Sequence, residues 1–265
     1  GARHVVINED FVRRVCRRAL SVGADGLILI EPSENADVRM VYYNADGGRA
    51  RLCGNGVRCV ARLASVRGHA RASGMTIEAD CGILKAEVTG DVAGFSLQLE
   101  SPEPRAMTLR IEGRPGEAFV TMQTTLVTVG VPHVVVQSPD AHGMPGDELA
   151  HVAPRLRRHP DLGPAGANVD FITIRDRHTL DIRCWERGIE GETLSSGSGC
   201  IAAALAAVNA GFADSPVNCR SRAGFVSTVT LQTGPDGTIL AHLAGDARII
   251  YEGRLDAEAL TGFHP

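Results

Sequence analysis

The sequence predicts an α+β fold with two pseudo-symmetric lobes, because one arrangement of elements occurs twice along its 265 residues. A Gly-x-Gly turn opens a helix of small residues at LCGNGVRCVARLA (52–64) and again at LSSGSGCIAAALAA (194–207). An offset of 143 positions aligns the glycines of the two copies. Alternating apolar patterns typical of strands precede and follow each copy. We therefore expect two related halves, with the two turns at equivalent points.

The first half begins with an expected helix at residues 8–23, where Asn8 or Asp10 is the candidate N-cap and Gly23 the expected stop. The Pro-punctuated stretch 101–108 is the predicted linker. Strands are expected at 26–33, 37–48 and within 75–100, then at 118–130, 132–138, 168–176, 179–188, 223–232 and 237–253, with a helix around 146–160. We assign residues 1–112 to the N-terminal lobe, 113–252 to the C-terminal lobe, and 253–265 to a tail that returns to the first lobe.

Composition restricts the function. A net charge of -4 provides no basic field for nucleic acid or an anionic membrane. No apolar run reaches membrane-spanning length, and no signal peptide opens the chain. The seven cysteines include no CxxC pair, which is typical of reduced thiols in a cytoplasmic protein rather than a disulfide framework or a metal site. A pyridoxal cofactor requires a lysine for its Schiff base. Lys85, the one lysine, lies within an alternating strand pattern, which argues against such a cofactor.

Each Gly-x-Gly turn presents free backbone N–H groups at the positive end of a helix, which is a site for an anion. Neither copy completes G-x-G-x-x-G, because Cys59 and Ala202 stand where the third glycine belongs. A carboxylate is therefore expected in place of a nucleotide. Cys53 precedes the first turn, and a thiol at a helix N-terminus has a lowered pKa and forms thiolate near neutral pH. Ser196 holds the same place before the second turn.

The stretches YYNADGGRARLCGNGVRC (42–59) and WERGIEGETL (185–194) resemble diaminopimelate epimerases. VGADGLILIE (22–31), GVPH (130–133) and NVDF (168–171) match in the same order, so the resemblance covers nearly the whole chain. Related proline racemases and hydroxyproline dehydratases usually carry histidine where Asn55 stands, which favours the diaminopimelate branch.

The resemblance implies two lobes, each with a mixed or antiparallel sheet around a central helix, and an active site in the cleft between them. It also implies a cofactor-independent, homodimeric epimerase of lysine biosynthesis that acts on a small amino acid. Two cysteines of the family exchange protons with opposite faces of the α-carbon, and Cys53 matches one of them. By the same carry-over, Asn44, Asn168, Glu186 and Arg187 bind polar groups of the substrate, and Gly54 and Asn55 with Gly197 and Ser198 form the two anion-binding turns.

Several of these residues also have an ordinary structural interpretation. Asn44 precedes Asp46-Gly47 and is able to shape a turn. Asn168 has the alternative of pairing with backbone at the start of a strand. For His133 the alternatives are a histidine packed within a strand and a substrate contact. Glu186 and Arg187 are neighbours, so a continuing strand would point them to opposite faces.

The chain departs from the family pattern at three places. Ser196 stands where the second cysteine belongs, and nothing beside it in the sequence supplies a general base. Cys200 lies one helical turn further on and is not expected to replace it. The family's opening strand is absent from this sequence, and Val131 occupies a position where some members have a substrate-binding asparagine. Ser196 is either an introduced change or natural drift, and both interpretations stay open.

Three functions follow from this pattern. The first is an epimerase of L,L- and meso-diaminopimelate, with turnover strongly impaired by Ser196. The second is a one-thiol dehydratase or isomerase of a small amino or hydroxy acid. The third is a non-catalytic amino-acid-binding protein.

Overall fold

The computed structural model describes residues 7–99, 103–194 and 196–256. The chain forms two compact units. Unit 1 comprises Gly1–Ala93 and Ala247–Pro265, and unit 2 comprises Gly94–Asp246. The limits at 112 and 252 that the sequence suggested differ from these, and the predicted tail 253–265 lies mostly outside the described residues. The assignment of lobes from the sequence stays a prediction.

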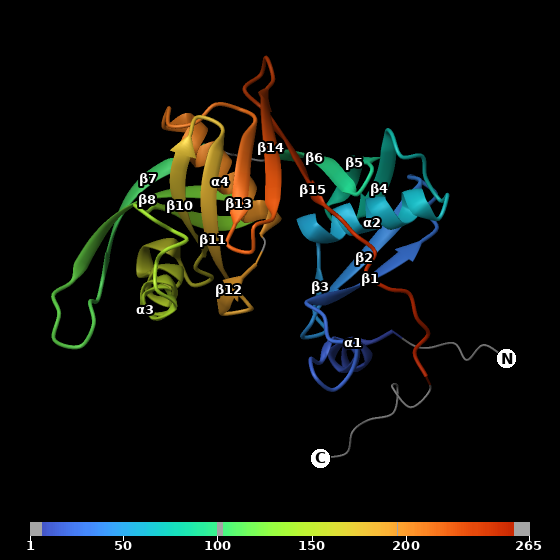
Figure 1. Cartoon of the computed structure of the whole chain (residues 1–265), viewed down its shortest axis with the longest axis horizontal. Helices are drawn as coiled ribbons and strands as arrows, with labels where there is room; N and C mark the ends of the chain where they lie inside the picture. The colour runs from blue at the N-terminus through green and yellow to red at the C-terminus, as the bar shows by residue number, and fades with distance from the viewer. Residues whose placement is uncertain (1–6, 100–102, 195, 257–265) are drawn as a thin grey trace. The chain divides into compact units, whose positions relative to one another are not determined.

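Unit 1 consists of a small sheet and two helices (Figure 1). β2 lies between β1 and β4, antiparallel to β1 and parallel to β4, and β5 follows β4 in an antiparallel hairpin. Helix α2 packs against these four strands. The elements are α1 (Glu9–Cys16), β1 (Gly26–Glu31), β2 (Val38–Asn44), β3 (Arg49–Ala50), α2 (Gly54–Val66), β4 (Met75–Ala79) and β5 (Gly82–Thr89).

The first helix is shorter than the sequence predicted. Of the two N-cap candidates, Asn8 is the N-cap, and its side chain accepts a hydrogen bond from the Phe11 N–H at 2.9 Å. The expected stop at Gly23 was wrong, because α1 ends at Cys16. Ala19 adopts a left-handed conformation with φ 65°, and the chain turns back so that the Gly23 N–H donates to the Val15 carbonyl. The returning loop thus satisfies helix carbonyls that a further turn of helix would have used.

Unit 2 contains a larger mixed sheet in the strand order β6-β15-β14-β13-β11-β10-β9-β8-β7, with β12 paired to β11. Its strands are β6 (Val92–Leu99), β7 (Arg105–Ile111), β8 (Val120–Val129), β9 (Val131–Gln137), β10 (Asn168–Asp176), β11 (Thr179–Glu186), β12 (Gly191–Thr193), β13 (Val217–Ser221), β14 (Val226–Thr233) and β15 (Ile239–Asp246). Its helices are α3 (Gly146–Arg157), the short 3₁₀ turn η1 (Pro160–Leu162) and α4 (Gly197–Asn209).

The predicted linker at 101–108 was wrong in its second part. Strand β7 begins at Arg105 and pairs antiparallel with β8 along its whole length, forming the long hairpin at the edge of unit 2 in Figure 1. Leu109 and Ile111 alternate with exposed residues and pack into the core, so the segment has the period of a strand. Pro104 precedes the strand and therefore does not interrupt its hydrogen bonds. Residues 101 and 102 lie outside the described chain.

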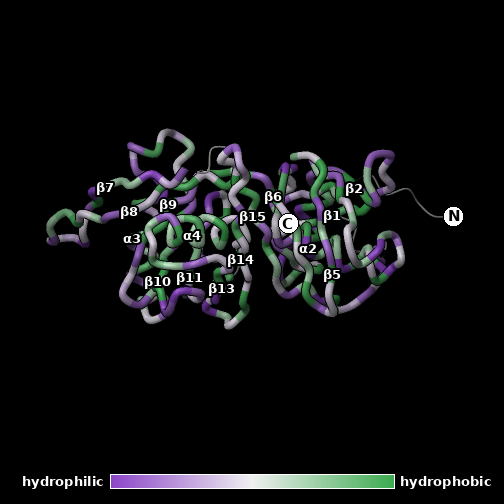
Figure 2. Tube along the Cα trace, turned by 90° about the horizontal axis from the view of Figure 1, so that it is seen from above, coloured by the Kyte–Doolittle hydropathy of each residue, from purple (hydrophilic) through white to green (hydrophobic). Residues whose placement is uncertain are grey.

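Helix α4 forms the centre of unit 2. It is buried on almost every side, as expected for a helix of alanine, glycine and other small or apolar residues that strands surround (Figure 2). Strands β8, β9, β10, β11, β13, β14 and β15 contact it. A second core region lies under α3, whose Leu149, Ala153 and Leu156 pack against Val169 and Phe171 of β10. No helix in the described residues of either unit is long and apolar enough to cross a membrane.

The two units repeat one topology, which confirms the predicted duplication. In each, an antiparallel hairpin (β1–β2, β10–β11) is followed by a short strand, a helix, and a strand parallel to the second strand of the hairpin. An offset of 142 positions superimposes the hairpin registers, so that the pair Ile28–Tyr42 corresponds to the pair Asp170–Cys184. Both helices have 13 residues. Each central helix is thus held by strands of its own unit.

Candidate active site

Helices α2 and α4 begin with the same capping geometry. Cys53 is the N-cap of α2, and its Sγ accepts a hydrogen bond from the Gly56 N–H at 3.3 Å. Ser196 is the N-cap of α4, and its Oγ accepts one from the Gly199 N–H at 3.2 Å. Their backbone angles agree closely, with φ -136° and ψ 108° at Cys53 and φ -128° and ψ 112° at Ser196. The thiol and the hydroxyl thus hold the same local position at the positive end of a helix.

The surroundings of these two caps differ in polarity. A Cβ atom on Gly56 would lie 2.9 Å from the Ile28 Cδ1 atom. A Cβ atom on Gly199, the corresponding residue of α4, would lie 2.6 Å from Asp170 Oδ1 and 3.1 Å from Cys184 Sγ. The thiol-bearing turn therefore rests on an apolar side chain, whereas the hydroxyl-bearing turn rests on a buried carboxylate and a thiol.

Glu186 brings a second carboxylate to the Ser196 cap. It ends β11 and is half-buried, and this burial raises the pKa of its carboxyl above the usual value. The nearby Ser196 hydroxyl acts in the opposite direction and lowers the pKa of Glu186. A carboxyl group that interacts with the hydroxyl therefore stands beside Ser196. The sequence neighbours of Ser196 had shown no general base, because Glu186 reaches it from another strand.

His133, Asp170 and Asn168 form a buried network within unit 2. His133 Nδ1 lies 2.7 Å from Asp170 Oδ2, and both side chains are fully buried. Asn168 Nδ2 lies 3.4 Å from His133 Nε2, and Asn168 Oδ1 accepts a hydrogen bond from the Arg187 N–H at 2.8 Å. His133 and Asn168 are thus engaged with protein groups. Strand β11 ends at Glu186, and Arg187 begins a turn. The alternation of side chains between the two faces of a strand therefore does not apply to Glu186 and Arg187.

Three predicted site residues of unit 1, Cys53, Gly54 and Asn55, lie at the start of α2, and Asn44 lies at the end of β2. Asn44 ends β2 with an exposed side chain, and its backbone carbonyl accepts the Gly47 N–H at 2.9 Å, as in the turn-forming interpretation. Gly54 opens α2 and is half-buried. Asn55 Oδ1 accepts a hydrogen bond from Arg58 Nη2 at 2.6 Å, so this side chain stabilises the first turn of the helix.

The remaining predicted residues of unit 2 lie in the first turn of α4. Gly197 is buried and Ser198 is half-buried. The segment that leads to them is fixed by Glu192 of β12, whose two carboxylate oxygens bind Nε and Nη2 of the fully buried Arg183 at 2.7 Å and 2.8 Å. Such a bidentate ion pair holds its partners rigidly. Glu192 therefore anchors the strand that positions Ser196.

Cys184, Cys200 and Cys219 are buried thiols close to the start of α4. Burial raises the pKa of Cys184 well above the usual range, and the neighbouring Asp170 raises it further. The Cys219 thiol donates to the Cys200 carbonyl at 3.5 Å. Cys200 is 4% exposed and packed within the unit.

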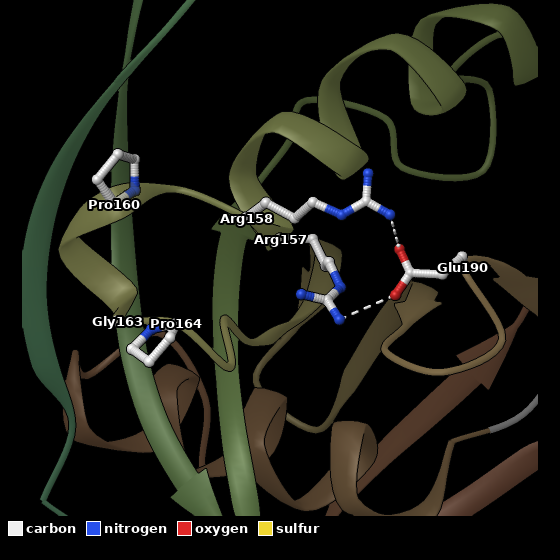
Figure 3. A pocket seen from close by; sticks show the side chains of 6 residues that line it. All are labelled: Arg157, Arg158, Pro160, Gly163, Pro164 and Glu190. Carbon is white, nitrogen blue, oxygen red and sulfur yellow. Dashed lines mark hydrogen bonds and ion pairs between the residues drawn. The ribbon is translucent and has the colours of Figure 1, made fainter.

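Two hollows, one in each unit, lie away from these residues. The one in Figure 3 belongs to unit 2, and both of its arginines are already paired with Glu190: Arg157 Nη2 at 2.9 Å and Arg158 Nη2 at 2.6 Å. Its lining comprises Arg157, Arg158, Pro160, Gly163, Pro164 and Glu190, none of them a predicted site residue. Another hollow lies in unit 1, between α2 and residues 247–253. In the described ranges no three His, Cys, Asp or Glu side chains are arranged to hold a metal ion.

Asp170 and Cys184 were not singled out from the sequence. The signal for Asp170 was nevertheless present, because VDFI (169–172) places one acidic residue among apolar ones. A charge in a buried strand requires a partner, and that partner is His133 on the neighbouring strand β9.

Known proteins resemble this chain in sequence and in fold. The family model described as diaminopimelate epimerase matches residues 2–99 and 125–249. A diaminopimelate epimerase of Gemmatimonas aurantiaca is 33% identical over 262 residues, covering 95% of this chain and 90% of the relative. One of Aquifex aeolicus is 35% identical over 259 residues, covering 96% and 88%.

Solved structures share the fold at lower identity. A phenazine biosynthesis protein of the PhzF family from Bacillus anthracis aligns with a TM-score of 0.66 and 16% identity, covering 90% of this chain and 86% of that one. A probable proline racemase from Agrobacterium radiobacter, with bound carbonate, aligns with a TM-score of 0.65 and 17% identity, covering 98% and 86%. These structures show the fold, and the family model with the sequence relatives shows that the chain belongs to the diaminopimelate epimerase family of isomerases.

Proposed function

We propose that this protein is an epimerase that interconverts L,L- and meso-diaminopimelate, with Cys53 and Ser196 exchanging protons with opposite faces of the α-carbon. The observation that carries this proposal is the shared geometry of the two caps, since each places one proton-exchanging atom at the N-terminus of a matching helix. The names of the sequence relatives support the substrate. By the same family argument, the reaction belongs to lysine biosynthesis in the cytoplasm, and the protein acts as a homodimer without a cofactor.

On the Cys53 side, the thiolate removes the α-proton of the substrate. The new S–H bond forms as the C–H bond breaks, and the electron pair spreads into the substrate carboxylate. The hydrogen bond from the Gly56 N–H and the field of α2 both favour the thiolate that this step requires. Backbone N–H groups in the first turns of α2 and α4, including those of Gly54, Asn55, Gly197 and Ser198, supply the anion-binding donors.

On the Ser196 side, the hydroxyl donates its proton to the carbanion and takes a proton from the carboxyl of Glu186. The reverse reaction runs these transfers backwards, with the Glu186 carboxylate as the final acceptor. A raised pKa suits this role, because Glu186 then holds a proton closer to neutral pH than an ordinary glutamate does. Asn44 and Arg187 remain the proposed contacts to polar substrate groups, whereas Asn168 and His133 support the site from beneath.

A hydroxyl exchanges protons with carbon less readily than a thiol, so we expect slow turnover from the chain as it stands. The test is proton NMR in heavy water with L,L- and meso-diaminopimelate offered separately to the protein and to Ser196→Cys, together with a chiral assay of the product. The variant is expected to epimerise faster, by roughly 100-fold. No gain in Ser196→Cys would contradict the two-base proposal.

The same experiment tests the alternatives. Loss of water or migration of a double bond in a hydroxy or amino acid, without inversion, would identify a one-thiol dehydratase or isomerase. Binding of diaminopimelate without any exchange of the α-proton, unchanged by Cys53→Ala, would identify a binding protein.

A further inference from the structure

Asp170 is a charged residue in the interior of unit 2. It lies in β10 with no exposed surface, between the buried residues Val169 and Phe171. Burying a carboxylate is costly unless hydrogen-bonding partners or nearby positive charge compensate it. One oxygen, Oδ2, pairs with His133 Nδ1 at 2.7 Å. The other, Oδ1, has no N–H or O–H partner in the described part of the chain and faces the Cys184 thiol. Such a residue requires an explanation beyond stability.

The hydrogen bonds around Asp170 determine where His133 carries its proton. The Arg187 N–H is a fixed donor, so the Asn168 atom that faces it must be the amide oxygen. The Asn168 NH₂ group then points to His133 Nε2, at 3.4 Å, and that nitrogen must act as the acceptor. His133 consequently carries its proton on Nδ1 and donates it to Asp170. The order of donors along this network thus leaves one consistent tautomer.

The network connects Asp170 to both proton-transferring groups of unit 2. Through His133 and Asn168 it holds the N–H of Arg187, the residue that directly follows Glu186. On its other side, Asp170 Oδ1 lies 2.6 Å from the point where a Cβ of Gly199 would stand, and the Gly199 N–H is the donor to Ser196 Oγ. One carboxylate is therefore hydrogen-bonded to the network that holds the Arg187 N–H, and it also lies beside Gly199 in the first turn of the Ser196 cap.

The corresponding position of unit 1 holds no carboxylate. The residue that corresponds to Asp170 is Ile28, which packs against Gly56 under the Cys53 cap. The Asp170 carboxylate thus lies under the Ser196 hydroxyl, and the Cys53 thiol has an apolar residue in its place. This is expected if Asp170 serves proton transfer by the less acidic hydroxyl.

We propose that Asp170 is a positioning residue for proton transfer on the Ser196 side. It keeps His133 in the Nδ1–H tautomer, and His133 holds Asn168, which in turn holds the Arg187 turn so that Glu186 stays beside Ser196. The inference rests on the proposed epimerase function for its kinetic consequence, but not for the tautomer itself.

The tautomer is measured directly by nitrogen-15 NMR of the histidine rings at pH 7.5. The His133 signal is assigned by its absence in His133→Gln. The unmodified protein should show a protonated Nδ1 and an unprotonated Nε2. Asp170→Leu removes the acceptor of the Nδ1–H, and a buried N–H without a partner is unfavourable. The proton should therefore move to Nε2 while the Asn168 amide turns its oxygen toward that nitrogen, which takes the acceptor away from the Arg187 N–H. Asp170→Asn still offers an acceptor oxygen and should retain the original tautomer.

The kinetic readout is solvent deuterium exchange from each substrate stereoisomer. Asp170→Leu should lower kcat for the isomer that presents its α-hydrogen to Ser196, by roughly 10- to 100-fold, while KM changes little. Exchange from the other isomer should persist, and Asp170→Asn should recover most of the loss. Asp181→Asn is the matched control, since Asp181 is also a fully buried carboxylate and binds Arg175 and Arg220 instead.

Three results would overturn the proposal: an Nε2–H tautomer in the unmodified protein, an unchanged tautomer in a folded Asp170→Leu, or equal losses from both isomers. If Asp170→Leu does not fold, the unmodified protein and Asp170→Asn still decide the tautomer. A protein that exchanges no α-proton from diaminopimelate but shows the expected tautomers would refute the epimerase function and leave the structural inference standing.

Discussion

The N-termini of α2 and α4 have the same backbone conformation and differ in the side chains that lie beneath it. The Cys53 cap rests on Ile28, and the corresponding Ser196 cap rests on Asp170. At the ends of the neighbouring strands, Asn44 in unit 1 corresponds to Glu186 in unit 2. The thiol therefore has apolar and amide residues in the places where the hydroxyl has two carboxylates.

This difference follows the acidity of the two side chains. A thiol ionises near neutral pH with the help of a helix N-terminus alone. An apolar side chain beneath the thiol is therefore sufficient. A serine hydroxyl does not ionise there and exchanges protons only when a base stands beside it. The duplicated backbone thus supports two kinds of proton transfer, and the surrounding residues decide which kind each half performs.

The largest effect is expected from removing the thiol. Cys53→Ala should lower the rate of epimerisation by at least roughly 1,000-fold, because no other group in the proposed mechanism removes the proton on that side. Epimerisation measured by a chiral assay checks this. Cys59→Ala is the matched control, since Cys59 is an exposed thiol of the same helix. Comparable losses in the two variants would show that the cap position of Cys53 is not what matters.

A smaller effect separates the two glycines under the caps. A methyl group on Gly56 meets the flexible ends of Ile28 and Met40, whereas one on Gly199 meets the Asp170 carboxylate that His133 holds in place. Gly199→Ala should therefore lower the free energy of unfolding by about 1–3 kcal/mol. Gly56→Ala should change it by less than about 1 kcal/mol, since alanine also favours the helix. Denaturant unfolding measures both, and equal costs would mean that the two sites are equally rigid.

The smallest effect concerns stability and pH. Folding raises the pKa of Glu186, so protonation favours the folded state and the ionised carboxylate costs stability at neutral pH. Glu186→Gln removes that cost and should raise Tm at pH 7.5 by roughly a few degrees. The gain should vanish below about pH 4, where an unfolded glutamate is itself protonated. A lower Tm for Glu186→Gln at pH 7.5 would show that the carboxylate stabilises the fold.

Much of the fold followed from the sequence. The duplicated turn-and-helix pattern predicted two similar halves, and strand β10 was expected at 168–176, the range it occupies. The first helix was overestimated because its apolar period continues beyond Cys16, while the loop back through Gly23 depends on contacts that no local pattern reveals. Strand β7 was taken for a linker because two prolines precede it.

The candidate site was less accessible to sequence reasoning. Cys53 and Ser196 were identified because a cap and the helix that follows it are neighbours along the chain. Glu186 was named as a substrate contact, but its place beside Ser196 depends on the pairing of β11 and β12. Asp170 meets His133 through the parallel pairing of β9 and β10, which joins segments more than 30 residues apart.

In the proposed mechanism Ser196 transfers protons with the help of the Glu186 carboxylate, whereas Cys53 acts without one. The most direct test of this mechanism is the rate of α-proton exchange in heavy water, measured separately for L,L- and meso-diaminopimelate with the protein and with Glu186→Gln. We predict a loss of roughly 100-fold for the isomer whose α-hydrogen faces Ser196, with exchange from the other isomer persisting. Equal losses for both isomers, or no loss for either, would contradict it.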